Sequence, residues 1–373
     1  MQYRKFGKTG FDVSALSFGC MRLPLKNDGT INESEAIAMI RYAIDNGVNY
    51  FDTAYGYHGG KSEVVLGKAL KDGYREKVKI STKLPMWVVE KTEDYDKFLN
   101  ESISRLGIDY IDFYLFHGIG KGSINKLNEL KLLDKMDSAI AAGKIKHACF
   151  SFHDDYDALK EVVSMYDNWS LVMAQFNYMD KHNQATENGV KYAYDKGLAV
   201  VAMEPCFGGR LANLPAEALS VLNEIGNKKT PVQWAFDWIW DYPEVSTVLS
   251  GMSNMQQLKD NLVYAENCKP GNMSEEDFNV ISKIEEAIKT VPQVPCTECK
   301  YCSCPQGVNI ISNIKILNDA LKFGIVGASR SYFMFTKEEE RAAKCTGCGV
   351  CEESCPQKIK IGEEMARLVS FLA

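Results

Sequence analysis

The sequence contains no long apolar run. No stretch of about 18 residues is apolar throughout, and the richest short one is PVQWAFDWIW at 231–240, so we expect no membrane-spanning helix. The opening residues MQYRKFGKTG have no apolar segment after their basic residues, which argues against a signal peptide. Positive charge is not in excess either, because 43 Lys and Arg face 49 Asp and Glu, a net charge of −6. We therefore expect neither a membrane nor a nucleic acid as partner.

Cysteine is sparse along most of the chain and dense near its end. Eight of the twelve cysteines fall within 296–355, and only Cys20, Cys149, Cys206 and Cys268 lie elsewhere. A secreted disulfide framework would spread its cysteines more evenly and would follow a secretory signal. The clustering instead predicts bound metal in a reducing, cytoplasmic environment.

Residues 13–265 alternate short apolar runs with helical patterns. The runs are ALSFGC, VNYFDTA, VKISTKL, IDFYLFH, IKHACFS, LVMAQFN, LAVVAMEP and VSTVLSG. Eight such units rich in Val, Ile and Phe predict the α/β class, with a parallel sheet closed into a (β/α)₈ TIM barrel. An open doubly wound sheet is the alternative, but no G-x-G-x-x-G turn follows the first run. Residues 1–12 predict a hairpin that turns at GKTG and covers the barrel floor.

The alternation stops after about residue 270. One more helix is expected over 274–290, and VPQVP at 291–295 reads as a stiff linker. Between the two cysteine groups, VNIISNIKILNDALKFG and KEEERAAK have helical patterns. We predict a barrel domain over 1–270, a helix and linker over 271–295, and a mostly α-helical, ferredoxin-like iron–sulfur domain over 296–373.

The two cysteine groups have the spacing of iron–sulfur ligands. The second group reads C-x₂-C-x₂-C-x₃-C-P and the first is a triad followed after one residue by Cys-Pro. A triad on one tight loop can hold three irons of a cube, while the remote fourth cysteine belongs to the partner cube. This predicts two [4Fe–4S] clusters with crossed ligands, Cys296, Cys299, Cys302 and Cys355 for one and Cys345, Cys348, Cys351 and Cys304 for the other. Structural zinc sites of the Cys₄ type are the alternative reading.

Ionisable side chains also stand at the ends of several predicted strands. They are Asp52 and Tyr57 after the second strand, Lys83 in the third and His117 in the fourth. Function in such barrels collects at the carboxyl ends of the strands. Because a charge inside an apolar strand is unfavourable unless it is paired, Asp52 and Lys83 are expected to form an ion pair. A purely structural salt bridge would explain that pair alone, but not all four residues at one mouth.

These four side chains suit the reduction of a carbonyl group. A hydride that reaches the carbonyl carbon leaves negative charge on oxygen, which requires a proton donor. The phenol of Tyr57 has an ordinary pKa near 10, and the adjacent Lys83 ammonium lowers that pKa by favouring the phenolate. Asp52 would hold Lys83 in place, and His117 would orient the substrate or share the proton.

The motifs FDTAYGY, STKLP and YLFHG resemble the tetrad motifs of the aldo-keto reductase family, in the family's order and spacing. The resemblance covers about residues 1–265, and the cysteine tail resembles that of an iron–sulfur branch of the same family. It implies a nicotinamide-dependent oxidoreductase that binds NADPH or NADH at the barrel mouth. Ser151 and Gln175 match the residues that hold the nicotinamide carboxamide. The adenosine phosphate end would be held by Gly251, Ser253, Asn254, Gln257 and Asn261.

The sequence departs from the family pattern in two respects, at three positions. Met203 stands where relatives often place an aromatic ring against the nicotinamide. Gly251 and Gln257 stand where NADPH-preferring members have Lys or Arg for the 2′-phosphate, which loses a charged contact there. A helix that starts at Ser253–Asn254 could receive a pyrophosphate, although an ordinary N-cap explains these residues equally well.

Three functions are compatible with the sequence. The first is a NAD(P)-dependent enzyme that interconverts an aldehyde or ketone with its alcohol, with clusters that are structural, redox-sensing or electron-transferring. The second is a reductase that receives electrons from a ferredoxin or another carrier through the clusters, because a cube passes one electron while nicotinamide gives a hydride. The third is a non-catalytic, redox-sensing coenzyme-binding module, against which the intact tetrad argues. We rank them in that order.

Overall fold

The computed structural model describes residues 1–226 and 229–372 and divides them into two compact units. The first unit consists of residues 1–205 and 235–274, and the second consists of residues 206–234 and 275–373. Among the described residues, no helix is long and apolar enough to cross a membrane.

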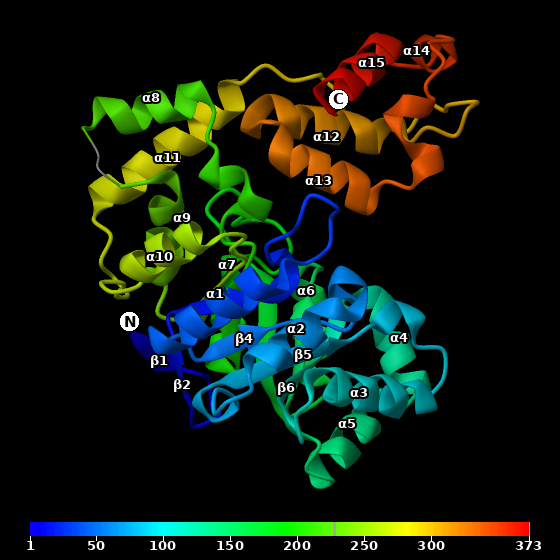
Figure 1. The fold of residues 1–373 in the computed structure, drawn as a ribbon. Helices are drawn as coiled ribbons and strands as arrows, with labels where there is room; N and C mark the ends of the chain where they lie inside the picture. Colours follow the sequence, from blue (N-terminus) through cyan, green and yellow to red (C-terminus); the bar gives the residue numbers. More distant parts are fainter. Residues whose placement is uncertain (227–228, 373) are drawn as a thin grey trace. The chain divides into compact units, whose positions relative to one another are not determined.

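The first unit is a closed barrel of eight parallel strands (Figure 1). In barrel order the strands are β10 (Thr247–Ser250), β3 (Leu16–Gly19), β4 (Tyr50–Asp52), β5 (Lys79–Leu84), β6 (Ile111–Ile119), β7 (Ile145–Phe152), β8 (Trp169–Gln175) and β9 (Ala199–Met203). Each strand lies within or across one of the eight apolar runs, so the predicted (β/α)₈ barrel is confirmed and the doubly wound alternative is wrong.

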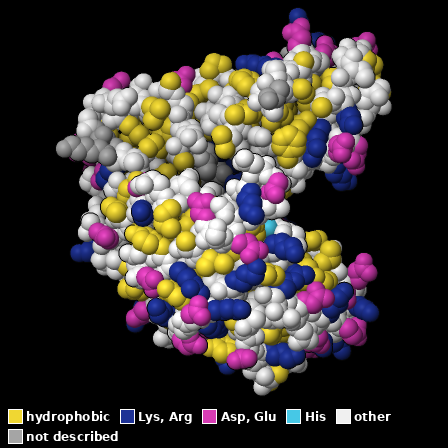
Figure 2. Space-filling view, in the orientation of Figure 1, with side chains coloured by type: hydrophobic (Ala, Val, Ile, Leu, Met, Phe, Trp, Pro, Cys, Tyr) yellow, Lys and Arg dark blue, Asp and Glu magenta, His cyan; other side chains and the backbone are white. Residues whose placement is uncertain are grey.

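Helices follow the strands and surround the barrel (Figure 1). They are α1 (Glu33–Asp45), α2 (Lys61–Ala69), α3 (Glu93–Leu106), α4 (Lys121–Glu129), α5 (Leu132–Ala141), α6 (Tyr156–Ser164), α7 (Thr186–Asp195) and α10 (Met255–Tyr264). On the face seen in Figure 2, Lys, Arg, Asp and Glu side chains are mixed over α1 to α5. Helices α1 and α2 are also linked by the exposed ion pair Lys68–Glu33, a kind of contact that stabilises a fold only weakly.

The barrel floor is closed by the N-terminal hairpin. Strands β1 (Tyr3–Lys5) and β2 (Asp12–Ser14) pair antiparallel, as the sequence predicted. Phe6, in the turn between them, is fully buried and its ring contacts Tyr50 and Phe113 at centroid distances of 5.2 and 5.1 Å. Because these rings fill the floor, the carboxyl ends of the strands are left for the site.

The second unit contains helices, and no strand occurs among its described residues. Helix α11 (Glu275–Thr290) packs against α8 (Ala216–Glu224), while α12 (Ile310–Phe323) packs against α13 (Ile325–Phe335) and α15 (Ile361–Leu372). The predicted helices at 274–290 and at 308–324 are present, whereas KEEERAAK forms two short 3₁₀ turns, Glu338–Glu340 and Ala342–Lys344. The apolar sides of α12 and α15 share one core with Cys351 and Cys355.

A close helix contact in the first unit generates a stability prediction. A Cβ added at Gly67 in α2 would lie 2.2 Å from the carbonyl oxygen of Leu106 at the end of α3. Gly67→Ala should therefore lower the free energy of unfolding by about 2 kcal/mol, measured by urea denaturation. Gly122→Ala is the control, because a Cβ there meets nothing within 4 Å and alanine favours a helix by about 1 kcal/mol. Equal changes in the two variants would contradict the prediction.

Candidate active site

A buried ion pair lies at the carboxyl ends of β4 and β5. The Lys83 ammonium donates to the Asp52 carboxylate over 2.6 Å, and both side chains are at most 3% exposed. Lys83 also donates to the Thr53 carbonyl over 2.9 Å, while Asp52 accepts from the Ser81 hydroxyl over 2.8 Å. These hydrogen bonds satisfy both charges, as a buried pair requires.

Tyr57 lies beside this pair at the start of a 3₁₀ turn, Tyr57–Gly60, that follows β4. The Lys83 Nζ donates to the Tyr57 Oη over 3.3 Å. Burial raises the pKa of Tyr57 above its ordinary value, with Asp52 adding to the rise, and Lys83 opposes it. The expected effect of Lys83 is therefore present, but a net lowering of the Tyr57 pKa is not, because desolvation of the phenolate outweighs it.

The charge on Lys83 is maintained by its neighbours. Burial lowers the pKa of Lys83, but Asp52 and Tyr57 both raise it, and the net direction is upward. For Asp52, Lys83 and Ser81 lower the pKa, but burial outweighs them and the net direction is upward. The charged ammonium of Lys83 favours release of the Tyr57 proton, because the phenolate that forms has a counter-ion beside it.

His117, near the end of β6, completes the group. Its ring lies 5.9 Å from the Tyr57 ring and 4.9 Å from the Trp87 ring, measured between centroids. Burial, with Lys83 and His153 adding to it, lowers the pKa of His117 to about 3, so the imidazole is neutral at physiological pH. Its Nδ1 is buried without a hydrogen-bond partner among the described residues, which leaves it available to a ligand.

An open pocket of about 390 Å³ borders His117. Its wall comes from the loop after β5, the end of β6, the start of α4 and the end of β7. The lining residues are Met86, Trp87, His117, Gly118, Gly122, Ser123, Lys126 and His153. Of these, the sequence had singled out His117 alone as a site residue.

The residues expected at the nicotinamide end already have partners within the barrel. The Ser151 hydroxyl accepts from the backbone N–H of Gly118 over 2.8 Å. The Gln175 amide bonds to Asp180 and to Gln184. Met203 packs against the hydrophobic core inside the barrel. Asn177, two residues after the end of β8, is fully buried, and its Oδ1 has no hydrogen-bond partner among the described residues, which fits a ligand that donates an N–H there.

The residues expected at the phosphate end build the start of α10. Asn254 is the N-cap and accepts from the Gln257 N–H over 2.9 Å, while the Gln257 side chain accepts from the Ser253 N–H over 2.8 Å. Asn261 is buried and donates to the Ser250 hydroxyl over 3.2 Å. The ordinary N-cap considered for the sequence is therefore present in the structure.

Arg22, in the turn after β3, lies against Gly251, which follows β10. A Cβ at Gly251 would come within 2.8 Å of the Arg22 Cγ, so the absence of a side chain there makes room for the arginine. Lys259, in contrast, is directed to the Tyr42 ring, 5.7 Å away. Arg22 follows the first barrel strand, 229 positions before Gly251, so sequence spacing could not indicate this contact.

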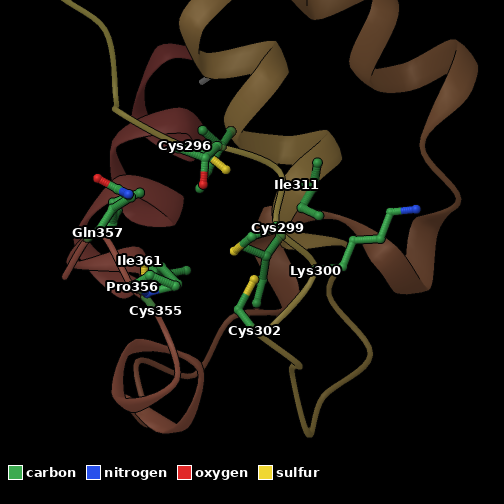
Figure 3. A pocket seen from close by; sticks show the side chains of 13 residues that line it. Cys296, Cys299, Lys300, Cys302, Ile311, Cys355, Pro356, Gln357 and Ile361 are labelled. Atoms are coloured by element: carbon green, nitrogen blue, oxygen red, sulfur yellow. The ribbon is translucent and has the colours of Figure 1, made fainter.

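The cysteines gather as two sets in the second unit. Cys296, Cys299, Cys302 and Cys355 line one pocket together with isoleucines of α12 (Figure 3). Burial raises the pKa of Cys302, and the nearby thiols of Cys296, Cys299 and Cys355 raise it further.

The second set centres on Cys351. Burial raises the pKa of Cys351 to about 11, with Cys304 and Cys345 among the neighbours that add to the rise. Cys348 is exposed. Within residues 1–226 and 229–372, no group of three or more His, Cys, Asp or Glu side chains has an arrangement that could hold a metal ion.

The first unit thus has the architecture of a (β/α)₈-barrel enzyme with polar groups at its mouth. The Aldo/keto reductase family model matches residues 15–286. This match spans well over half of the chain, and the chain therefore belongs to the aldo/keto reductase family and is an oxidoreductase.

Individual relatives agree with this assignment. The chain is 27% identical to "Probable aldo-keto reductase 1" of Glycine max over 295 residues, 69% of this chain and 82% of the relative. It is 26% identical to L-galactose dehydrogenase of Arabidopsis thaliana over 315 residues, 78% of this chain and 96% of the relative. The solved structure of aldo-keto reductase AKR11C1 from Bacillus halodurans, in its holo form, has a TM-score of 0.64 and 26% identity, and the match covers 76% of this chain and 96% of that one.

The low pKa of His117 predicts a pH dependence of stability. Between about pH 6.5 and pH 3, His117 takes up a proton in the unfolded chain but not in the folded protein, so acidification favours unfolding. Lowering the pH from 7 to 5 should remove about 2 kcal/mol of stability through this residue. Over the same pH range, the free energy of unfolding of His117→Gln, measured by urea denaturation, should fall by about 2 kcal/mol less than that of the wild-type protein. The lowered pKa values of His58, His147 and His153 contribute in both proteins. Parallel pH profiles for the two proteins would contradict the prediction.

Proposed function

We propose that the enzyme interconverts a small aldehyde or ketone with the corresponding alcohol, with Tyr57 as the proton donor and acceptor. The single observation that supports this is the position of Lys83, whose ammonium donates to Asp52 and to Tyr57 at once. An ion pair with a purely structural role would not require a phenol within hydrogen-bond reach of its ammonium.

Each side chain then has a distinct task. In reduction, the Tyr57 Oη donates its proton to the carbonyl oxygen as negative charge develops there. Lys83 stabilises the phenolate that remains, and Asp52 keeps Lys83 charged and in position. His117 is neutral, so it orients the carbonyl through a hydrogen bond and does not deliver a proton itself. In alcohol oxidation the same groups act in reverse.

We propose NADPH or NADH as the coenzyme, which supplies the hydride when it is bound. Ser151, Gln175 and Met203 would contact its nicotinamide end, and the unpartnered Asn177 Oδ1 would accept from the carboxamide. Gly251, Ser253, Asn254, Gln257 and Asn261 would hold the phosphate end. The guanidinium of Arg22, whose side chain lies over Gly251, would supply a positive charge that positions 251 and 257 lack.

For the second unit we propose two [4Fe–4S] clusters with crossed ligands. Cys296, Cys299, Cys302 and Cys355 would hold one, and Cys345, Cys348, Cys351 and Cys304 the other. The four thiols that line one pocket with Ile310, Ile311 and Ile314 support the first assignment. Because the thiolates of a cube bind four different irons, they lie farther apart than the ligands of a single ion. This proposal makes residues 296–373 a ferredoxin-like domain that follows, in sequence, a 1–270 barrel domain and a 271–295 linker, in a reducing cytoplasm.

The clusters would be structural, redox-sensing or electron-transferring. Cys299 and Cys348, one in each proposed ligand set, are exposed, which would bring an edge of each cube to the protein surface. This observation favours electron exchange with a ferredoxin or another carrier as the second candidate function. Because nicotinamide transfers a hydride and a cube transfers single electrons, that route does not explain carbonyl reduction by the tetrad.

Replacement of Tyr57 tests the proposed reaction. Tyr57→Phe should lower kcat for NADPH- or NADH-dependent carbonyl reduction by about 10²–10⁴-fold, because the general acid is lost. Tyr50→Phe is the matched control, since Tyr50 is fully buried in β4 and its ring packs against Phe6 at the barrel floor. Turnover in Tyr57→Phe equal to that of the control would refute the assignment of Tyr57.

Iron content tests the crossed ligands. Protein purified without oxygen should contain about eight iron atoms, and Cys302→Ala/Cys355→Ala should retain about four, because both cysteines belong to one cube. If each cube instead took its ligands from one group, the same double variant would lose both clusters. Cys268→Ala, outside both groups, should leave the iron content unchanged.

A further inference from the structure

The pocket beside His117 carries one positive charge that has no negative partner in the described part of the chain. Lys126 of α4 lines this pocket, and its ammonium donates to the carbonyls of Met86 and Val89 over 3.0 and 2.9 Å. It forms no ion pair with any carboxylate of the described residues. Two carbonyl bonds leave the third ammonium proton for a ligand and leave the charge uncompensated.

The rest of the pocket does not neutralise this charge. No Asp or Glu is among its lining residues. The acids of the loop after β7 have other partners at the start of α4, since Asp154 accepts from the backbone N–H of Lys121 and Asp155 pairs with the Lys121 ammonium over 2.7 Å. His117 and His153 both have a pKa lowered by burial, so neither imidazole adds a charge near neutral pH.

The pocket also offers an apolar surface between its two polar ends. Trp87 is 62% exposed and its ring contacts His117, while Met86 lies beside it in the same loop. A carbonyl group placed at Tyr57 and His117 would be followed by a carbon skeleton along Trp87 and then by whatever group meets Lys126.

We propose that the substrate is a carbonyl compound with a carboxylate, and that Lys126 selects it by pairing with that carboxylate. One lysine charge matches a monoanionic carboxylate better than a dianionic phosphate ester. Removal of a carboxylate from water is unfavourable unless the carboxylate pairs with a positive charge, which Lys126 provides. A neutral substrate would leave the Lys126 charge unpaired. This inference rests on the proposed carbonyl reduction and adds the substrate class.

Matched substrates test this selection. 4-Formylbenzoate and its methyl ester present the same aldehyde and ring with and without the charge. For the wild-type protein, kcat/KM should be at least about 10-fold higher for the acid, the effect of one charge-assisted contact. Lys126→Met should remove most of this ratio through KM for the acid, and Lys126→Arg should retain it. Lys121→Met, on the same helix but outside the pocket lining, should leave the ratio unchanged.

A binding measurement separates this inference from the proposed function. 4-Methylbenzoate, which cannot be reduced, should bind the wild-type protein in calorimetry and bind Lys126→Met about 10-fold more weakly. A formyl phenyl phosphate that outcompetes the acid would overturn the carboxylate assignment.

Three further outcomes would overturn it. Equal losses for acid and ester in Lys126→Met would show that Lys126 only ties its loop to α4. Reduction of both aldehydes without preference would refute the substrate class while carbonyl reduction stands. No reduction of either aldehyde would refute the proposed function itself.

Discussion

The buried pair of Asp52 and Lys83 is the constraint on which the site depends. Transfer of both charges out of water is unfavourable by several kcal/mol per ion, and an apolar pair of similar size would often give a more stable barrel. The neighbouring strands compensate in part, through the Thr53 carbonyl and the Ser81 hydroxyl. The pair fixes the Lys83 ammonium in a buried position, where it donates a hydrogen bond to the phenol of Tyr57. Burial alone would make that phenol a weaker acid, and Lys83 is the group that opposes this effect.

The barrel and the cysteine-rich unit suggest two kinds of electron transfer in one chain. The tetrad suits the transfer of a hydride and a proton, which moves an electron pair, while iron–sulfur cubes move single electrons. The one-electron chemistry of the clusters and the two-electron chemistry of the tetrad are compatible if the clusters stabilise the second unit or respond to the redox state. A thiol pocket walled by the isoleucines of α12 suits the structural role, because cluster assembly would then complete a hydrophobic core. The exposed Cys299 and Cys348 suit exchange with a carrier.

Sequence patterns predicted the elements whose cause is local. Apolar runs of strand length located all eight barrel strands. Contacts between distant segments were missed, because no local pattern encodes them: Arg22 against Gly251 and Lys126 beside His117 depend on loops that meet at the barrel mouth. Helix α13 was not predicted, since IVGASRSYFMF lacks a clear apolar stripe and exposes Phe333 and Phe335. The net pKa direction of Tyr57 required its burial, which only the fold provides.

The most direct test of the central claim is the pKa of Tyr57 itself. It can be followed by the ¹³Cζ NMR signal of labelled tyrosine, assigned by its absence in Tyr57→Phe, in the wild-type protein and in Lys83→Met/Asp52→Asn, which leaves no buried charge unpaired. If Lys83 favours the phenolate more strongly than Asp52 opposes it, the Tyr57 pKa should rise when the pair is removed. An unchanged or lower pKa in the double variant would contradict the account, because the ammonium would then have no influence on the proton that the proposed reaction transfers.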